Sequence, residues 1–403
     1  MCPRPAPTSD LSTDQPPHRP RASHPVDTYP MSTTPPTLIK VRTSAEVLAV
    51  APYMLGYQPQ QSVVFVLFDG KRTCGALRLD LPTDTSPVTF KRFANFALGT
   101  VAKVRGVAAI APMIFTDATF GDDSRIPHTE LMDVLRRRIR HMGFEVRDAL
   151  CLAGDGWASY LAPSIPKGGQ ALEELHEAMA AFLPQLPDAP IDRDQSAGSV
   201  RVPLDPVKGA STLLRIAGLQ EVIDDLSDEQ VASSFLARDA TPLFVERVLS
   251  WSDEDIEQRA WLALFRFQNP PMRDQAMLQW AFGIDFGERL FAATEDAGAD
   301  FRKLAPELGD RMLGIGPRPD LARVNRGIDL LRRFLDAATD DLRPAPLCML
   351  AWLSWAIGRS THAAEYIEQA LAIDPNYGMA TLLASLLDAG LLPEWAFDRS
   401  SGS

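Results

Sequence analysis

Two apolar runs rich in β-branched residues most constrain what this chain can fold into. The runs are SVVFVLF (residues 62–68) and VAAIAPMIF (residues 107–115), and a segment with helical periodicity lies between them. Runs of this kind are typical of buried strands. Strands joined through single helices form a mostly parallel sheet, because each helix serves as the crossover. The front half of the chain is therefore predicted to be an α/β domain.

The first run ends in Asp69-Gly70, a pair favoured in tight two-residue turns, and KRTCGALRLDLP then runs back. This pattern predicts one β-hairpin within the otherwise mostly parallel sheet. A second alternating segment, FEVRDALCLAG (residues 144–154), is predicted to be another strand.

Three helices are predicted from start and stop signals. Thr43 and Glu46 have the spacing of a capping box, which predicts a helix from about 44 to 55. Ser86 followed by Pro87 predicts the start of a second helix. A third helix is predicted from 127 to 142, because Gly143 follows it.

Composition divides the chain into four predicted segments. Residues 1–30 carry eight prolines and almost no large aliphatic side chains, so they cannot bury enough apolar surface to offset their ordering entropy. Met31 precedes the first structural signals and is an alternative start to Met1. The predicted segments are a disordered tail (1–36), an α/β domain (37–183), a Pro- and Asp-rich linker (184–204) and an all-α helical domain (205–403).

Charge and cysteine usage narrow the class of protein. The formal net charge of −12 argues against a nucleic-acid partner, which requires positive potential. No run of about 18 apolar residues is present, so no membrane span is predicted. The four cysteines are far apart and form no CxxC pair, which predicts neither a disulfide framework nor a zinc site. A reducing cytoplasmic location is expected.

The C-terminal helical domain contains one repeat-like unit. The segment LCMLAWLSWAIGRSTHAAEYIEQALAIDPNY (residues 347–377) resembles a single tetratricopeptide unit, and a third helix at about 377–388 is predicted to stack on it. One unit cannot bury its apolar face alone, so neighbouring helices or a protein partner must cover it. Trp352 and Trp355 are interpreted as core residues, with an interface as the alternative.

Candidate ligand-binding residues lie where strands are predicted to end. Ligands in open α/β sheets gather at the carboxyl ends of strands, which directs attention to the loop 116–126 and to GDGWASY (154–160). Aromatic and polar side chains in the second stretch suit recognition of a small ligand. These are Asp155, Trp157, Ser159 and Tyr160. The competing interpretation is a tight turn at Asp155-Gly156 with the tryptophan packed on the sheet.

Two further groups are weighed in the same way. Tyr53 lies in APYMLGYQPQQS (51–62), which could line a pocket or only end a helix. Arg78 and Asp80 are two residues apart and would share a face of a strand, where they could bind a ligand or form a structural ion pair.

The three stretches together resemble an uncharacterised bacterial family. The blocks are Pro52-Tyr53-x-Leu55-Gly56-x-x-Pro59-x-x-Ser62, Arg78-x-Asp80-Leu81-Pro82 and Asp155-Gly156-Trp157-x-Ser159-Tyr160. In order and spacing they resemble domain-of-unknown-function family 4192, which occurs mainly in actinobacteria. The resemblance covers much of the chain from about residue 38 and implies a bacterial cytoplasmic setting. Many relatives carry cysteines in the loop after the tyrosine, but APSIPKGGQ (162–170) has none, so no thiol role is implied there.

Signatures of common chemistry are absent from the sequence. Glu173 and His176 are three residues apart, but a metal site would need further ligands, so neither a metal nor a cofactor is predicted. The cluster of four arginines and a histidine at 136–141 is interpreted as a solvated helix face, with a site for phosphate or nucleic acid as the alternative. No P-loop, GxSxG or dinucleotide fingerprint occurs.

Two functional hypotheses remain. The first is a non-catalytic regulatory or scaffolding protein that binds a protein partner through its C-terminal helices. The alternative is an enzyme acting on a small polar or phosphorylated substrate at the sheet edge, with Asp155, Tyr160, Arg78 and Asp80 converging on one centre.

Overall fold

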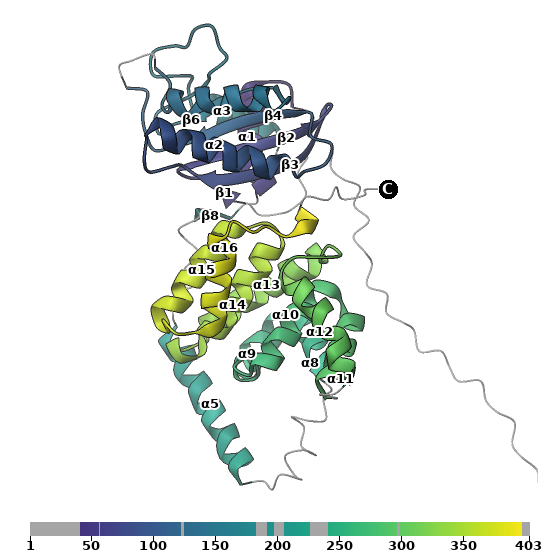
Figure 1. The fold of residues 1–403 in the computed structure, drawn as a ribbon. Coiled ribbons are helices and arrows are strands. Elements are labelled where there is room, and N and C mark those ends of the chain that lie inside the picture. Colours follow the sequence, from purple (N-terminus) through teal and green to yellow (C-terminus); the bar gives the residue numbers. More distant parts are fainter. Residues whose placement is uncertain are drawn as a thin grey trace, which may run out of the picture. The chain divides into compact units, whose positions relative to one another are not determined.

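The structure of the chain is a computed structural model. It describes residues 41–55, 57–121, 125–182, 192–196, 205–225, 241–295 and 299–396 (Figure 1). The predicted disordered tail, the choice between Met1 and Met31 and most of the predicted linker lie outside these residues. We call the described residues from 41 to 182 the sheet part and those from 205 to 396 the helical part, and each is described by itself.

The sheet part alternates short helices and strands. In chain order its elements are α1 (Ser44–Leu55), β1 (Tyr57–Gln58), β2 (Ser62–Asp69), β3 (Arg72–Asp80), α2 (Pro87–Val101), β4 (Ala109–Phe115), α3 (Thr129–His141), β5 (Glu145–Val146), β6 (Leu150–Leu152), β7 (Trp157–Ser159) and α4 (Glu173–Phe182). A further strand, β8 (Asp192–Ser196), pairs in parallel with β1.

The predicted local signals are confirmed in atomic detail. The amide of Glu46 donates to Thr43 Oγ1 at 3.2 Å, and Glu46 Oε2 accepts from the amide of Thr43 at 3.1 Å, which completes the capping box of α1. Ser86 accepts from the amide of Thr89 at the start of α2. At the β2–β3 turn, Gly70 has a φ of 56°, a conformation that glycine adopts without steric cost.

The sheet is mixed, which corrects the prediction of a mostly parallel sheet. In the described residues the strand order is β3-β2-β4-β6-β7, and β5 also pairs with β4. Strand β2 is antiparallel to both β3 and β4, whereas β4 is parallel to β5 and β6, and β7 is antiparallel to β6. The physical reason is that α2 connects β3 to β4 across β2. Strand β2, the hairpin partner of β3, therefore lies between two parallel strands and is antiparallel to both.

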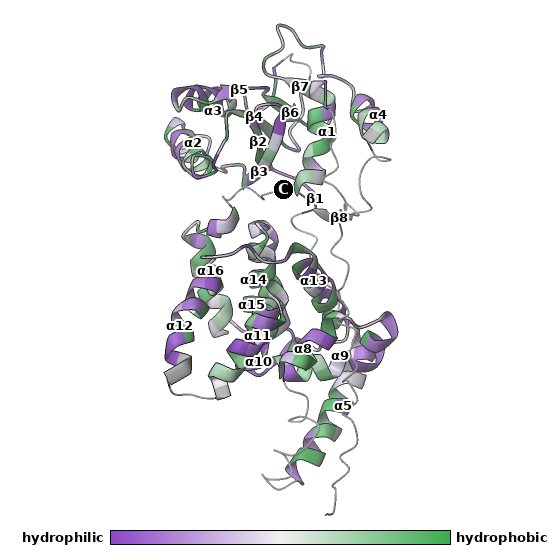
Figure 2. Cartoon of the chain, turned by 90° about the vertical axis from the view of Figure 1, so that its right-hand side faces the viewer, coloured by the Kyte–Doolittle hydropathy of each residue, from purple (hydrophilic) through white to green (hydrophobic). Residues whose placement is uncertain are grey.

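Helices cover both faces of the sheet (Figure 2). On one face, Val63, Phe65 and Ile114 pack in a core with residues of α2 and α3. On the other face, Val64 and Met113 pack with residues of α1 and α4. The alternation follows from the pleat, because successive side chains of a strand point to opposite faces. The near-continuous apolar runs thus reflect a sheet buried on both sides.

Every described element of the helical part is a helix, as predicted from about residue 205 onward. They are α5 (Pro206–Asp224), α8 (Thr241–Leu249), α9 (Asp253–Phe267), α10 (Pro270–Phe282), α11 (Ile284–Glu295), α12 (Ala299–Met312), α13 (Leu321–Asp336), η2 (Asp340–Leu342), α14 (Pro344–Ala356), α15 (Ser360–Ile373), α16 (Gly378–Asp388) and η3 (Glu394–Ala396). Within the described residues none of these helices is both long and apolar enough to span a bilayer.

Helix α14 forms the centre of the helical core. Every one of its residues is buried, and α10, α13, α15 and α16 pack against it. The interpretation of Trp352 and Trp355 as core residues is confirmed, since they are 0% and 1% exposed. Their indole nitrogens donate to the carbonyls of Met312 and Leu391, so neither ring leaves a polar atom unsatisfied.

Candidate functional site at the carboxyl edge of the sheet

Strands β3, β4 and β6 run in the same direction and end at one edge of the sheet. Register places Asp80, Ser62, Phe115, Leu152 and Trp157 in one row across this edge. The loops that follow the row are where an α/β sheet offers its backbone and side chains to a ligand.

A polar cluster lies where β4 ends. We call Gln61, Thr116, Asp117 and His128 the edge cluster. Thr116 Oγ1 is 3.1 Å from Gln61 Oε1 and 3.0 Å from His128 Nε2, and Gln61 Nε2 donates to Asp117 Oδ2 at 3.2 Å. The amide of Ala118 donates to the same threonine oxygen at 3.2 Å. The cluster brings together residues from before β2, after β4 and before α3.

The hydrogen bonds of the edge cluster run in one direction. The Gln61 amide nitrogen is fixed by its bond to Asp117, so Gln61 Oε1 must accept, and the Thr116 hydroxyl supplies the proton. With that proton engaged, Thr116 Oγ1 can only accept from His128, which therefore carries hydrogen on Nε2. His128 Nδ1 is left as an acceptor.

Burial keeps His128 neutral, because desolvation lowers the pKa of its imidazole below the ordinary value. The neutral ring agrees with the hydrogen-bond direction, since a single proton on Nε2 satisfies the contact with Thr116. Two acceptor groups of the cluster are then left for a ligand, the exposed Asp117 carboxylate and Nδ1 of the half-buried His128.

Backbone strain is concentrated in the edge cluster. In the described part of the chain, Gln61 (φ 39°) and His128 (φ 56°) are the non-glycine residues with positive φ, and both contact Thr116. Such conformations cost on the order of 1 kcal/mol each and persist only where surrounding contacts impose them.

Two of the predicted ligand-binding residues hold the loop around this cluster. Asp155 accepts from the amides of Phe120 and Gly121 at 2.9 and 3.3 Å. The Tyr160 hydroxyl donates to the carbonyl of Pro127, next to His128. Tyr160 is buried, and desolvation raises its pKa well above the ordinary value, so the phenol stays protonated. Asp155 and Tyr160 thus position the loop rather than facing a ligand.

Glycines let the β6–β7 turn approach two segments closely, the loop after β4 and residues 168–170. The amide of Gly154 donates to the carbonyl of Ala118 at 3.0 Å. A Cβ on Gly156 would lie 2.4 Å from the carbonyl oxygen of Gly168, closer than any real contact. The Asp155-Gly156 pair therefore serves a turn, as the competing interpretation of the stretch held, and that turn joins β6 to β7.

Trp157 and Ser159 make contacts within the sheet part instead of facing the edge cluster. The indole of Trp157 is 7% exposed and packs on the face covered by α1 and α4, and its Nε1 has no partner among the described residues. Ser159 Oγ donates to Asp148 at 2.7 Å, and the same carboxylate accepts from Ser44 Oγ at 2.6 Å. Ser159 thus helps to fix α1 against β7.

The remaining predicted residues lie elsewhere. Tyr53 is half-buried on α1. Arg78 and Asp80 form an ion pair at 2.6 Å on β3, in which the arginine side chain is 5% exposed and the aspartate 78% exposed. Strands β3 and β7 are at opposite ends of the strand order, four spacings or about 19 Å apart. The structure therefore does not bring Arg78 and Asp80 together with Asp155 and Tyr160.

Sequence reasoning selected the segments that carry Gln61, Thr116 and Asp117 but missed His128. The loop 116–126 was selected by the strand-end rule, and Gln61 belongs to the weighed stretch 51–62. His128 gave no signal, because no motif spacing connects it to Thr116. Over the described residues no group of three or more His, Cys, Asp and Glu side chains is placed to hold a metal ion.

Fold and site together define an α/β protein with a polar cluster at the carboxyl edge of a mixed sheet, followed by a helical part. The chain belongs to the family described as Domain of unknown function (DUF4192), which matches residues 45–293 and 316–394. This confirms the family resemblance of the three sequence blocks. Searches of curated proteins and of solved structures gave no match.

Proposed function

We propose that the protein is a non-catalytic binding protein with a regulatory or scaffolding role. Its sheet edge binds a small polar ligand, and its helical part offers a surface to a protein partner. The observation that supports this proposal is the direction of the hydrogen bonds in the edge cluster.

A hydroxyl–imidazole contact can activate a nucleophile only if the imidazole accepts the hydroxyl proton. In the edge cluster the Thr116 hydroxyl donates its hydrogen bond to Gln61 Oε1, and His128 Nε2 donates to the threonine oxygen. The lowered pKa of His128 also makes it a weaker base. This arrangement supports recognition over catalysis.

The two acceptor groups of the edge cluster indicate what the ligand must carry. The Asp117 carboxylate and His128 Nδ1 both accept hydrogen bonds, so they favour a ligand that donates them through hydroxyl or amine groups. A phosphate without donors would meet the aspartate charge unfavourably.

The proposed partner surface lies on the outside of the C-terminal helices. We treat α14 and α15 as the tetratricopeptide-like unit and α16 as its cap. Because α14 is completely buried, it cannot present a surface itself. On α16, Leu382 is 73% exposed and is the natural centre of an apolar contact.

An actinobacterial origin and a cytoplasmic location belong to the same proposal. They are supported by the family resemblance and by Cys74, Cys151 and Cys348, which form no disulfide among the described residues. Burial raises the pKa of Cys151 and Cys348 to about 12, which suits inert thiols in a reducing compartment.

The ligand proposal is tested by thermal shift on the full chain with a panel of polyols, sugars, amines and amino acids. A ligand bound by the native state must raise the melting temperature. We expect a donor-bearing compound to do so, and Asp117→Asn to weaken its binding. Asp388→Asn, which removes the same charge from an exposed position on α16, is the matched control and should bind as the wild type does.

The 3.0 Å contact between Thr116 and His128 is the observation that favours the enzyme alternative. A time course by NMR separates the two. If a bound compound is consumed over many turnovers and Thr116→Val stops this, the protein is an enzyme. A panel without any donor-bearing binder also contradicts the proposed recognition site.

The partner surface is tested by crosslinking in lysate of the native host. Deleting residues 343–403 would remove the centre of the core, so a point change is the sharper test. Leu382→Glu should abolish capture of a specific crosslinked protein, whereas Leu321→Glu, at a 48% exposed leucine of α13, should not. Equal capture by both variants contradicts the proposed surface.

A further inference from the structure

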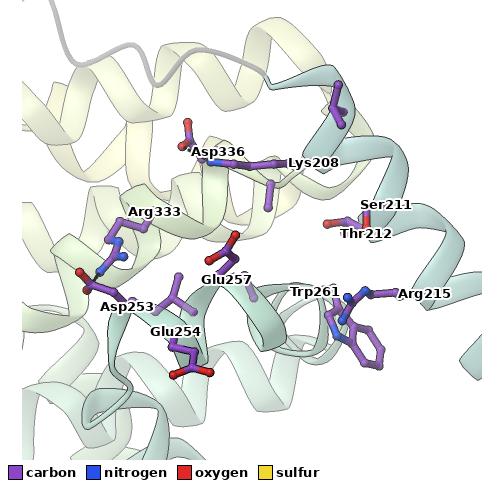
Figure 3. Close-up of a pocket in the computed structure, with 14 residues that line it drawn as sticks. Lys208, Ser211, Thr212, Arg215, Asp253, Glu254, Glu257, Trp261, Arg333 and Asp336 are labelled. Carbon is purple, nitrogen blue, oxygen red and sulfur yellow. Dashed lines mark hydrogen bonds and ion pairs between the residues drawn. The ribbon is translucent and has the colours of Figure 1, made fainter.

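The helical part contains an open cavity of about 740 Å³ between α5, α9 and α13 (Figure 3). This volume falls within the range of small-molecule sites in proteins. Helix α5 contributes Lys208, Ser211, Thr212 and Arg215, and α9 contributes most of the opposite wall.

Two bonds hold α5 over the cavity. Lys208 Nζ is 3.2 Å from Asp336 Oδ2 on α13, and Arg215 Nη1 donates to the carbonyl of Gln258 on α9 at 2.9 Å. Lys208 and Arg215 are two helical turns apart on one face, so both ends of that face are fixed while the space between them stays open. The cavity is thus framed by specific contacts.

The lining leaves an excess of negative charge. Among its described residues are three basic and four acidic side chains, a formal charge of −1. Lys208 is paired with Asp336, and Arg333 is paired with Asp253 at 2.6 Å. The remaining charged groups are Arg215 and the two glutamates of α9, Glu254 and Glu257.

Glu257 is the acidic group best placed for a ligand. Figure 3 shows its carboxylate directed into the space between the helices, and no hydrogen bond or ion pair of it is found among the described residues. Glu254 differs, because it accepts from Gln258 Nε2 at 3.0 Å. Trp261 is one turn beyond Glu257 on the same helix face, where its ring can cover an apolar group.

A second polar group lines the same space. Thr212 is 4% exposed and belongs to the cavity wall on α5. Its hydroxyl can both donate and accept a hydrogen bond, which suits a polar occupant. Buried Ile256 and Ala260 supply an apolar floor.

We propose that this cavity binds a small organic cation, an aliphatic amine or guanidinium with an apolar chain. The positive group pairs with Glu257 and donates to the Thr212 hydroxyl, and the chain lies along Ile256 and the ring of Trp261. An anionic ligand would meet two carboxylates and only one unneutralised arginine. A neutral ligand of the same shape would leave Glu257 unpaired.

The test compares three probes with one six-carbon chain by isothermal titration calorimetry on the full chain. They are hexylamine, hexanol and hexanoate. Hexylamine is expected to bind at least several-fold more tightly than the other two. Glu257→Gln should weaken hexylamine binding about fivefold, the size of one ion pair at a partly exposed site, and Trp261→Ala should weaken it by a similar factor.

The matched control is Glu288→Gln, which removes the same charge from an exposed position on α11 and should leave hexylamine affinity unchanged. Each variant is checked for unaltered thermal unfolding. Three results overturn the proposal: no saturable hexylamine binding up to about 10 mM, equal binding of hexanol, or equal loss of affinity in the Glu257 and Glu288 variants. The site is independent of the edge cluster, so neither outcome decides the other.

Discussion

Gly156→Ala tests whether the turn between β6 and β7 must lie against residues 168–170, which follow β7. The backbone φ of Gly156 is ordinary, so the position needs glycine for space alone. An added Cβ would lie 2.4 Å from Gly168 O and 3.0 Å from Gln170 O. Both are backbone atoms, so the loop itself must move by about 1 Å to restore van der Waals contact. Overpacking of this kind costs about 1–3 kcal/mol, and reduced freedom of the unfolded chain returns about 0.4–1 kcal/mol. We expect a net local loss of about 1–2 kcal/mol.

Gly99→Ala is the matched control. Gly99 lies in α2, and an added Cβ there meets nothing within 4 Å. The same substitution should therefore stabilise α2 by about 0.5–1 kcal/mol. Hydrogen exchange read by mass spectrometry assigns each effect to its own peptides. Amides in residues 153–170 should exchange about 5–30 times faster in Gly156→Ala, while those of α2 slow down in Gly99→Ala.

The result that would refute this reasoning is unchanged exchange across residues 153–170 in Gly156→Ala. It would mean that the loop accepts a side chain without losing its contacts. The β6–β7 turn and residues 168–170 would then not be held at the separation seen here.

Three further predictions concern single groups. Thr116→Val should destabilise the sheet part by about 1–2 kcal/mol, because Gln61 Oε1 loses its donor, and urea denaturation measures the loss. Burial lowers the pKa of His128 below 6.5, so the unfolded chain binds the proton more readily; stability should be retained above about pH 6.5 and fall below it, and His128→Gln should remove this slope from unfolding curves. Because burial raises the pKa of Cys151 and Cys348 to about 12, iodoacetamide at pH 8 should alkylate both thiols far more slowly in the native chain than in urea, as followed by mass spectrometry.

The helix starts and the hairpin turn were predicted from contacts between residues that are close in sequence. The capping box of Thr43 and Glu46 and the cap at Ser86 define helix starts through bonds between residues three apart, so their spacing is visible in the sequence. The Asp69-Gly70 turn works in the same way. Each of these features is complete within four residues, and tertiary packing did not overrule any of them.

Strand order required information that spacing does not contain. The segment 144–154 was predicted as one strand, but it forms β5 and β6 with a break at residues 147–149. Asp148 lies in this break, and its carboxylate accepts hydrogen bonds from Ser44 on α1 and Ser159 on β7. Neither partner can be identified from the spacing of residues within the segment. Strand β7 was predicted as a loop, since three residues give too short an alternation to detect.

The candidate site shows the same limit more sharply. The DGWxSY stretch drew attention because it combines a carboxylate, an indole, a hydroxyl and a phenol. Asp155 and Tyr160 satisfy backbone groups of the neighbouring loop instead of a ligand. Residue types therefore located the region correctly, while the roles depended on which backbone groups needed partners.

Both proposed sites are built from residues far apart in the sequence. Thr116 is 55 residues from Gln61, and the cavity joins α5 to α13 through a bond that spans 128 residues. A ligand at either site would connect elements that local propensity cannot hold together. Its binding free energy would then add to the stability of the part that contains it. Hydrogen exchange should accordingly slow at both Gln61 and His128 when the sheet edge is occupied, and in both α5 and α9 when the cavity is filled. Protection of Gln61 without His128, or of α5 without α9, would mean that the ligand contacts only one side of the site. That result is incompatible with the geometry proposed for the site.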